Sequence, residues 1–272
     1  MRDRYAVIGN PIEHSKSPLI HTAFAEQTGE TLDYHRLLGE PGHFEENVRS
    51  FFDQGGLGLN ITVPFKEEAW QLADERSERA ETAGAVNTLI LLADGRIRGD
   101  NTDGAGLVRD LTINHGYPLS GRRILLLGAG GASKGVVRPI LDSSPSLLVI
   151  ANRTAAKAVD LANNLTHLGE VKGCGLEQLA GQVFDLIING TAAGLQGDVP
   201  PIPDNLLATG GWTYDMMYSS EPTAFVRWSN ERGATKALDG LGMLVEQAAE
   251  SFYLWRGVRP LTHTVIEMLR NP

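Results

Sequence analysis

The most constraining feature of the sequence is a short apolar run that ends in a cluster of glycines, Arg123-Ile-Leu-Leu-Leu-Gly-Ala-Gly-Gly-Ala-Ser-Lys-Gly135. Residues 124–127 fit a buried parallel strand, and the apolar spacing of residues 132–141 predicts a helix directly after the glycines. This order is typical of a dinucleotide-binding unit, because bare backbone lets a pyrophosphate approach the N–H groups of a helix N-terminus. The alternative is a glycine-rich turn in an ordinary α/β unit, and the GxxxxGK[ST] pattern of a P-loop is absent. The predicted pyrophosphate-binding residues are Gly128, Ala129, Gly130, Gly131 and Ala132.

A second apolar run, residues 147–151, ends about 20 residues after the glycines, where the residue that recognises the adenosine ribose is expected. Enzymes that use NAD place an Asp or Glu there, but residues 144–159 contain no carboxylate. Arg153 is present instead, and a guanidinium can pair with a 2′-phosphate and stack on adenine. The sequence therefore predicts NADP(H), the alternative being a solvated loop cation. The predicted residues of this site are Asn152, Arg153, Thr154 and Lys157.

Length and charge exclude several classes of protein. A chain of 272 residues has room for two modest domains, and a formal charge of −9 argues against non-specific binding to nucleic acid or to anionic membranes. Cys174 is the only cysteine, and His14 and His21 have no metal-ligand partners at useful spacing, so we expect no metal. The N-terminus lacks the apolar core of a signal peptide, and no run approaches the ~20 apolar residues of a membrane helix. We therefore expect a soluble cytoplasmic protein.

Two hydroxyls near the N-terminus mark a candidate anion site. Ser17 followed by Pro18 predicts an N-cap and a first helical residue, with the helix extending to about Gln27. Capping explains Ser17 in structural terms, but it does not explain Ser15. Together with Lys16, the two hydroxyls at a helix N-terminus form a candidate site for a carboxylate.

The segment Gly56-Leu-Gly-Leu-Asn-Ile-Thr-Val-Pro-Phe-Lys66 alternates apolar residues with small or polar ones. This pattern predicts a strand whose core face carries Leu57, Leu59, Ile61 and Val63. Asn60 and Thr62 then lie on the opposite face, and Lys66 lies in the first turn of a helix. A cation is unfavourable at that end of a helix dipole, which indicates another role for Lys66. The alternative is a solvated strand face followed by an exposed lysine.

A predicted hairpin brings a second group of polar residues together. Asp94-Gly95 lies between two strand-like runs, which is a strong hairpin signal. Asn87 begins the first run and Asp103 follows the second, so we expect both at one end of the ladder. Asp103 also precedes a helix, where capping is the alternative role. Capping and catalysis do not exclude each other, because a carboxylate has several acceptor sites.

Eight blocks of the sequence, taken in order, resemble shikimate dehydrogenases over nearly the whole chain. Each block alone is weak, but the ordered set is specific. The blocks are Ser15-Lys16-Ser17-Pro18, Asn60-x-Thr62-x-Pro64-Phe65-Lys66, Gly84-Ala-Val-Asn87-Thr88, Gly99-Asp-Asn-Thr-Asp103-Gly104, Gly128-Ala-Gly-Gly-Ala-Ser133, Asn152-Arg-Thr154, Tyr214-Asp-Met216-x-Tyr218 and Asp239-Gly240-x-Gly242-Met-Leu-x-x-Gln247. The departures are Ser133, where the fingerprint has Gly or Ala, and the variable loop Thr191-Ala-Ala-Gly194.

The resemblance implies the reversible NADPH-dependent reduction of 3-dehydroshikimate to shikimate, a step of aromatic amino-acid biosynthesis. It implies a catalytic pair, Lys66 and Asp103, and places Met216 and Gly240 at the cofactor. By the same matching, the substrate carboxylate and ring would be held by Ser15, Ser17 and Tyr218, and its hydroxyls by Asn60, Thr62, Asn87, Asp103 and Gln247. The chemistry agrees, because a lysine ammonium can stabilise and protonate the oxygen on which negative charge grows during hydride transfer.

Strand and helix patterns predict an α/β protein of two domains. We expect an N-terminal α/β substrate domain, residues 1–103 and 240–272, and a Rossmann-type doubly wound dinucleotide-binding domain, residues 104–239. The active site is expected in the cleft between them. The expected partner is the small-molecule substrate, with no nucleic acid and no membrane, and the chain is expected to be a monomer or a homodimer.

Two alternatives to this function remain open at the level of sequence. A quinate/shikimate dehydrogenase that uses NAD would share the serines and the Lys/Asp pair, although Arg153 argues against NAD. A catalytically silent sensor that binds NADP(H) would keep the glycine turn and lose the chemistry. The presence of both Lys66 and Asp103 argues against a sensor.

Overall fold

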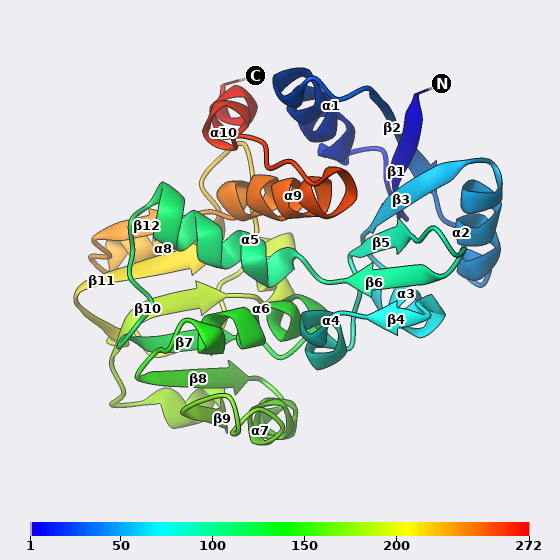
Figure 1. Ribbon diagram of the computed structural model, residues 1–272. Helices are drawn as coiled ribbons and strands as arrows, with labels where there is room; N and C mark the ends of the chain where they lie inside the picture. Colours follow the sequence, from blue (N-terminus) through cyan, green and yellow to red (C-terminus); the bar gives the residue numbers. More distant parts are fainter. Residues whose placement is uncertain (1, 272) are drawn as a thin grey trace. The chain divides into compact units, whose positions relative to one another are not determined.

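The computed structural model describes residues 2–271, and the chain folds into two compact units (Figure 1). Unit 1 consists of Met1–Gly106 and Leu244–Pro272, and unit 2 of Leu107–Met243. The sequence analysis placed the corresponding limits at residues 103 and 239. Two helices cross the limits, namely α5 (Asp103–Arg109) and α9 (Leu241–Arg256).

Unit 1 contains a mixed six-stranded sheet in the order β2-β1-β3-β5-β6-β4. Strand β1 pairs in parallel with β2 and β3, whereas β5 is antiparallel to both β3 and β6. The predicted hairpin is confirmed, with Gly95 in the left-handed region at a φ of 85°. The strands are β1 (Asp3–Gly9), β2 (Leu32–Leu38), β3 (Gly56–Ile61), β4 (Glu75–Arg76), β5 (Thr88–Leu91) and β6 (Ile97–Asp100).

Both faces of the unit 1 sheet are covered at β1, whose side chains alternate between two apolar clusters. Ala6 and Ile8 pack with side chains of α2 and α3, whereas Tyr5 and Val7 pack on the side of Tyr34 and Trp255. The remaining helices of this unit are α1 (Ser17–Thr28), α2 (Phe44–Asp53), α3 (Lys66–Leu72), α4 (Glu78–Ala83) and α10 (His263–Arg270).

The predicted N-cap role of Ser17 is wrong. Ser17 is the first residue of α1, and Lys16 occupies the cap position with helical dihedral angles, φ −86° and ψ −5°. Within the described residues, α1 has no side-chain hydrogen bond at its cap. Instead, the Ser17 backbone N–H donates to Ser15 Oγ at 3.3 Å. The Ser15 hydroxyl therefore accepts a hydrogen bond from a backbone N–H at the start of the helix. This is a structural role for Ser15 that the sequence analysis did not assign.

The predicted alternation along residues 57–63 holds only in the middle of β3. Leu59 and Ile61 pack in the cluster with α2 and α3, but Leu57 packs on the opposite side of the sheet. The register between β1 and β3 shifts at Arg4/Tyr5, so one extra residue on β3 turns Leu57 to the other face. Val63 lies beyond the strand and is 68% exposed, so its assignment to the core is wrong.

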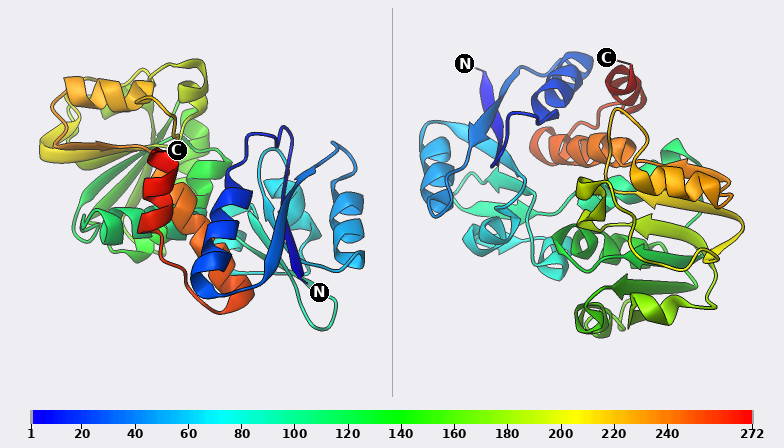
Figure 2. Two further views of the ribbon diagram at one scale, coloured as in Figure 1. Left: turned by 90° about the horizontal axis from the view of Figure 1, so that it is seen from above. Right: turned by 180° about the vertical axis from the view of Figure 1, so that it is seen from behind.

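Unit 2 contains an all-parallel sheet in the order β12-β11-β10-β7-β8-β9, with helices on both faces (Figure 2). This is the doubly wound dinucleotide-binding topology, whose strand order reverses between β7 and β10. The strands are β7 (Arg123–Leu127), β8 (Leu147–Asn152), β9 (Val171–Gly175), β10 (Phe184–Asn189), β11 (Leu207–Asp215) and β12 (Lys236–Leu238). The helices include α6 (Gly131–Asp142), α7 (Ala155–Asn163) and α8 (Ala224–Glu231).

Among residues 2–271, each helix is too short or too polar to span a membrane. The same residues contain no cluster of three or more His, Cys, Asp or Glu side chains that could hold a metal ion.

Candidate active site

Lys66 and Asp103 form a close ion pair in unit 1. Lys66 Nζ donates to Asp103 Oδ2 at 2.6 Å, and the two side chains are 25% and 11% exposed. Lys66 opens α3 directly after the Pro64 turn, and Asp103 opens α5 directly after the hairpin. The Lys66 backbone carbonyl also accepts from Val86 N–H at 2.8 Å, which ties α3 to the segment before β5. The fold thus joins residues 37 positions apart in the sequence.

Asn87 fixes the orientation of the Asp103 carboxylate. Asn87 Nδ2 donates to Asp103 Oδ1 at 2.8 Å, while Lys66 occupies the other carboxylate oxygen. Asn87 Oδ1 in turn accepts the backbone N–H of Thr102 at 2.9 Å. The Asn87 backbone N–H donates to the Asp100 carbonyl at 3.0 Å, which anchors it to the end of β6. The prediction that the hairpin brings Asn87 and Asp103 together is confirmed.

A layer of buried polar side chains, here called the polar layer, lies behind this pair. It consists of Asn60, Asn87, Thr88, Thr102 and Ser251, each at most 6% exposed. Ser251 Oγ is its centre, because it contacts Asn60 Nδ2 at 3.0 Å, Thr88 Oγ1 at 2.8 Å and Thr102 Oγ1 at 3.2 Å. In a dry interior such mutually bonded groups fix one another's orientation.

The sequence analysis missed Thr88, Thr102 and Ser251. The first two lie inside recognised blocks, but their polarity alone did not distinguish them from solvated residues. Ser251 lies four residues after Gln247 on α9, and its Oγ also approaches the Gln247 carbonyl at 3.1 Å. The i,i+4 spacing was the available signal, because it places both side chains on one helix face.

Gln247 reaches the same group of residues from α9. Its Oε1 lies 3.4 Å from both Asn87 Nδ2 and Thr102 Oγ1, and its Nε2 donates to the Leu244 carbonyl at 2.8 Å. The side chain is partly exposed, whereas those of Asn87 and Thr102 are buried. Gln247 therefore lies at the edge of the buried face of α9, next to the residues around Asp103.

Ser15, Ser17 and Thr62 lie at other points of unit 1. Ser15 Oγ donates to Ser17 Oγ at 3.2 Å, so the two hydroxyls face each other at the start of α1. Thr62 follows β3, and its backbone N–H donates to the Ile8 carbonyl at 3.0 Å. Asn60 is held from another side, because its Oδ1 accepts the hydroxyl of Tyr34 at 2.7 Å.

His21 is a fully buried histidine next to the polar layer. Its ring stacks on Tyr34 with centroids 4.3 Å apart and planes 5° apart. Burial lowers the pKa of His21 to about 3, and the neighbouring Asn60 side chain opposes this only in part. Within the described residues, neither ring nitrogen has a hydrogen bond of normal geometry. His21 is thus a neutral aromatic packing residue.

The glycine turn of unit 2 fits a pyrophosphate. Gly128 has a φ of 105°, and an added Cβ would lie 3.0 Å from the Gly190 carbonyl oxygen, so a tight turn requires glycine here. At Gly130 and Gly131, by contrast, a Cβ would meet no atom within 4 Å in the described part of the chain. The space is therefore open above the start of α6, whose first turn carries no acidic residue. Ala129 is buried under the turn, and Ala132 is exposed beside it.

The departure at Ser133 is explained by its packing. Ser133 is fully buried, and its Oγ donates to the Gly190 carbonyl at 3.4 Å. A Cβ on Gly190 would lie 2.5 Å from Ser133 Oγ, so the serine fits only because residue 190 is glycine. The hydroxyl thereby links the start of α6 to the end of β10 at the point where the strand order reverses.

The predicted 2′-phosphate site is an exposed cluster at the start of α7. Arg153 and Lys157 are both exposed, and the first turn of the helix carries no acidic residue. Asn152 Nδ2 donates to the Thr154 carbonyl at 3.0 Å, which shapes the turn between β8 and α7. Two cations at a helix N-terminus, with their charges turned to solvent, fit a phosphate monoester.

Three further predicted site residues follow the end of β11, namely Met216, Tyr218 and Gly240. Met216 N–H donates to the Asn189 carbonyl at 2.9 Å, and a Cβ on Gly240 would lie 2.3 Å from the Met216 carbonyl oxygen. Glycine is thus required at 240 by the close approach of two backbone segments. Tyr218 is partly buried, which raises the pKa of its hydroxyl.

A buried carboxylate holds the segment that carries Met216 in place. Asp215 accepts from Thr223 Oγ1 at 2.6 Å and from Asn189 Nδ2 at 3.1 Å. Burial raises the pKa of Asp215, and these hydrogen bonds oppose the shift.

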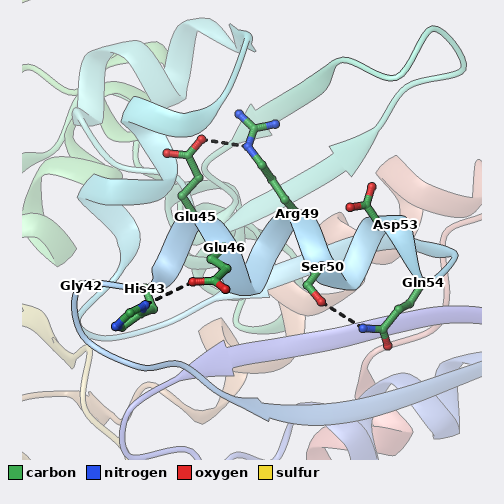
Figure 3. A pocket seen from close by; sticks show the side chains of 8 residues that line it. All are labelled: Gly42, His43, Glu45, Glu46, Arg49, Ser50, Asp53 and Gln54. Atoms are coloured by element: carbon green, nitrogen blue, oxygen red, sulfur yellow. Dashed lines mark hydrogen bonds and ion pairs between the residues drawn. The ribbon is translucent and has the colours of Figure 1, made fainter.

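A large hollow of unit 1 lies elsewhere, along the exposed side of α2 (Figure 3). Its volume is about 640 Å³, but its side chains pair with one another. Arg49 bonds Glu45 at 2.8 Å, and His43 bonds Glu46 at 3.2 Å. None of the predicted site residues lines it. We therefore place the candidate site at Lys66 and Asp103, where close polar groups are buried and aligned, and not at this open surface.

Three family models match the chain. The model of the shikimate dehydrogenase substrate binding domain matches residues 7–89, and that of shikimate/quinate 5-dehydrogenase matches residues 111–196. The model of the shikimate 5′-dehydrogenase C-terminal domain matches residues 240–270.

Individual relatives cover the chain from end to end. The shikimate dehydrogenase (NADP(+)) of Alkalilimnicola ehrlichii is 59% identical over 270 residues, which are 99% of this chain and 99% of that protein. The crystal structure of an Ael1 enzyme from Pseudomonas putida has a TM-score of 0.93 at 49% identity and covers 99% of both chains. The shikimate 5-dehydrogenase of Thermus thermophilus, in complex with NADP(H) and shikimate, has a TM-score of 0.87 at 31% identity and covers 98% of both chains.

Proposed function

Because this chain belongs to the shikimate dehydrogenase family, we propose that Lys66 and Asp103 are the acid–base pair of its reaction. The reaction is the reversible, NADP-dependent interconversion of 3-dehydroshikimate and shikimate in the shikimate pathway. The observation that carries the assignment is the 2.6 Å contact between Lys66 Nζ and Asp103 Oδ2, with the carboxylate oriented by Asn87. A charged pair that is largely withdrawn from water is suited to move a proton at a developing charge.

The proton chemistry follows from this geometry. NADPH, held by the cofactor residues of unit 2, would supply a hydride to the C3 carbonyl carbon of 3-dehydroshikimate. Lys66 donates a proton from Nζ to the C3 oxygen as negative charge grows there, so that a hydroxyl forms and no free alkoxide accumulates. In the opposite direction, the neutral Lys66 amine accepts the C3 hydroxyl proton. Asp103 keeps Nζ directed at that oxygen throughout, and Asn87 keeps Asp103 from rotating.

The proposed substrate contacts divide into two groups. Ser15 and Ser17, with Tyr218, hold the carboxylate and ring, and their hydroxyls are suitable donors to a carboxylate. Asn60, Thr62, Asn87, Asp103 and Gln247 hold the ring hydroxyls. Support for the second group comes from the polar layer, which limits the orientations that the Asn60 and Asn87 amides can take.

The proposed cofactor contacts lie in unit 2. The residues are Gly128, Ala129, Gly130, Gly131 and Ala132 at the pyrophosphate, Asn152, Arg153, Thr154 and Lys157 at the 2′-phosphate, and Met216 and Gly240 at the nicotinamide. Support comes from the open space at Gly130 and Gly131 and from the exposed cations at the start of α7. The prediction that substrate and cofactor meet between the two units stays a prediction.

The decisive test of function is an absorbance assay with purified protein. We expect 3-dehydroshikimate to cause loss of NADPH absorbance, and shikimate with NADP+ to restore it. Binding of NADPH without any substrate-dependent loss would instead favour the catalytically silent sensor. Comparing kcat/KM for NADPH with NADH, and for shikimate with quinate, tests the alternative enzyme, a quinate/shikimate dehydrogenase that uses NAD.

Two sequence predictions remain to be measured. We predicted a cytoplasmic location, and a chain that is either a monomer or a homodimer. Sedimentation equilibrium of the purified protein distinguishes a mass of 29.4 kDa from twice that value.

A further inference from the structure

One face of strand β2 contacts two of the proposed substrate ligands. Tyr34 and Arg36 are two residues apart on β2, so their side chains leave the same face of the sheet. The Tyr34 hydroxyl donates to Asn60 Oδ1 at 2.7 Å. Arg36 Nε and one terminal nitrogen both donate to the Ser15 carbonyl, at 3.1 and 2.6 Å. Neither Tyr34 nor Arg36 was singled out by the sequence analysis.

We propose that Arg36 is a positioning residue for the substrate carboxylate, acting through its two hydrogen bonds to Ser15. This inference rests on the proposed role of Ser15 and Ser17 as carboxylate ligands. The Arg36 side chain does not itself need to contact the substrate. It fixes the backbone that carries the Ser15 hydroxyl.

Ser15 lies before the first residue of α1, so the hydrogen bonds of the helix do not hold its backbone. Other groups must therefore fix this segment. Ser15 N–H donates to the Ile12 carbonyl at 3.1 Å, so Arg36 holds the other end of the same residue. With the carbonyl and the N–H both bonded, the backbone of Ser15 is fixed, and its Oγ lies 3.2 Å from Ser17 Oγ. Two donors in a fixed fork restrict rotation of the carbonyl, which a single flexible ammonium does not.

The charge of Arg36 adds to this effect. The chain has a formal charge of −9, and the proposed substrate is an anion. A guanidinium bonded to Ser15 places positive charge beside the two serine hydroxyls. Loss of Arg36 is therefore expected to affect the charged substrate more than a neutral analogue.

The test uses the full-length enzyme with shikimate and with shikimate methyl ester, which lacks the negative charge. For Arg36→Gln, we expect kcat/KM for shikimate to fall about tenfold, mainly through KM, with a smaller fall for the ester. The KM for NADP+ is expected to stay unchanged. Arg36→Lys keeps the charge but not the fork, so we expect it to recover only a minor part of the loss. Arg49→Gln is the matched control, because Arg49 is an exposed arginine of unit 1 that pairs with Glu45 on α2 (Figure 3).

Three results would overturn the inference. They are an Arg36→Gln enzyme with shikimate kinetics within twofold of the wild type, equal losses for acid and ester, and full recovery in Arg36→Lys. Failure of the proposed function is distinguishable from these results. In that case the wild type itself does not oxidise shikimate, or Ser15→Ala and Ser17→Ala leave the KM for shikimate unchanged.

Discussion

Around Lys66 and Asp103 in unit 1, the proposed ligands of the substrate are bonded to one another. Asn87 contacts both Thr102 and Asp103, and Ser251 joins Asn60 to Thr88 and Thr102. The proposed ligands of the cofactor in unit 2 are different. Arg153 and Lys157 are exposed, and the backbone at Gly130 and Gly131 faces open space.

This difference indicates two ways of preparing a binding site. In unit 1 the protein supplies the partners of each polar group, so little reorientation is needed when a small polyhydroxy acid binds. In unit 2 charge and backbone donors are left to solvent, and in our proposal the phosphates of the cofactor replace that water. Substitutions in unit 1 should therefore change the chemical step or the affinity for shikimate, whereas those in unit 2 should change the choice of cofactor.

The largest effect is expected at the ion pair. Lys66→Ala and Asp103→Ala should each lower kcat by about 1,000-fold, because general acid–base catalysis contributes on the order of 10²–10⁴. The KM for shikimate should change much less. Steady-state kinetics of shikimate oxidation measure both values, with Lys172→Ala, an exposed lysine of unit 2, as the control. A kcat near that of the wild type in both variants would remove the pair from the mechanism.

The next effect tests the exposed cations of unit 2. Arg153→Ala should raise the KM for NADP+ by about tenfold to 100-fold, since hydrogen bonds to charged groups contribute about 1.5–3 kcal/mol. The kinetics with NAD+ should not change, because NAD+ lacks the 2′-phosphate. Equal losses with NADP+ and NAD+ would show that Arg153 does not recognise that phosphate.

The effect of pH on stability is expected to differ between the two units. The pKa of His21 is lowered to about 3 in the folded state, against about 6.5 when unfolded. Below pH 6.5 the unfolded chain takes up a proton that the folded chain does not, so acid favours unfolding by about 2 kcal/mol at pH 5. In His21→Phe this loss between pH 7 and pH 5 should disappear. Urea unfolding at both pH values measures it, with the exposed His167→Phe as the control; equal acid sensitivity in all three proteins would contradict the assignment.

Protonation of Asp215 in unit 2 is expected to change stability in the opposite direction from protonation of His21. Its pKa is raised by burial, so the folded state holds a proton more tightly than the unfolded state does. Acidification through that raised pKa therefore stabilises this part of the fold. Hydrogen exchange resolved by segment should show α1 and β2 losing protection before β10 and β11 as the pH falls. Earlier loss in β10 and β11 would contradict the contrast.

The smallest effect is expected in the polar layer. Ser251→Ala removes one hydroxyl from the layer but leaves the direct ligands in place, so the KM for shikimate should rise about threefold. Ser229→Ala is a matched control, because Ser229 is also buried in a helix and donates to the Phe225 carbonyl at 2.7 Å. A similar change in the KM for shikimate in both variants would show that Ser251 acts only through stability.

The sequence predicted those parts of the fold and site that depend on local pattern. Gly128, Asp94-Gly95 and the spacing to Arg153 each reflect a turn or a strand end, which neighbouring residues specify. The bulge that turns Leu57 over depends on pairing with β1, so alternation along the strand misassigned that residue. The cap position of Lys16 depends on the Ser15 side chain, so the Ser17-Pro18 pattern misassigned the cap. Ser251 and Arg36 were missed for the same reason, since their partners are distant in sequence.

The most direct test of the central claim is a crystal structure with shikimate and NADP+ bound. Our account predicts Lys66 Nζ within hydrogen-bond distance of the C3 oxygen while still bonded to Asp103, with Arg153 at the 2′-phosphate. A complex in which Lys66 points away from the C3 oxygen, or in which Arg153 is remote from the adenosine, would contradict it.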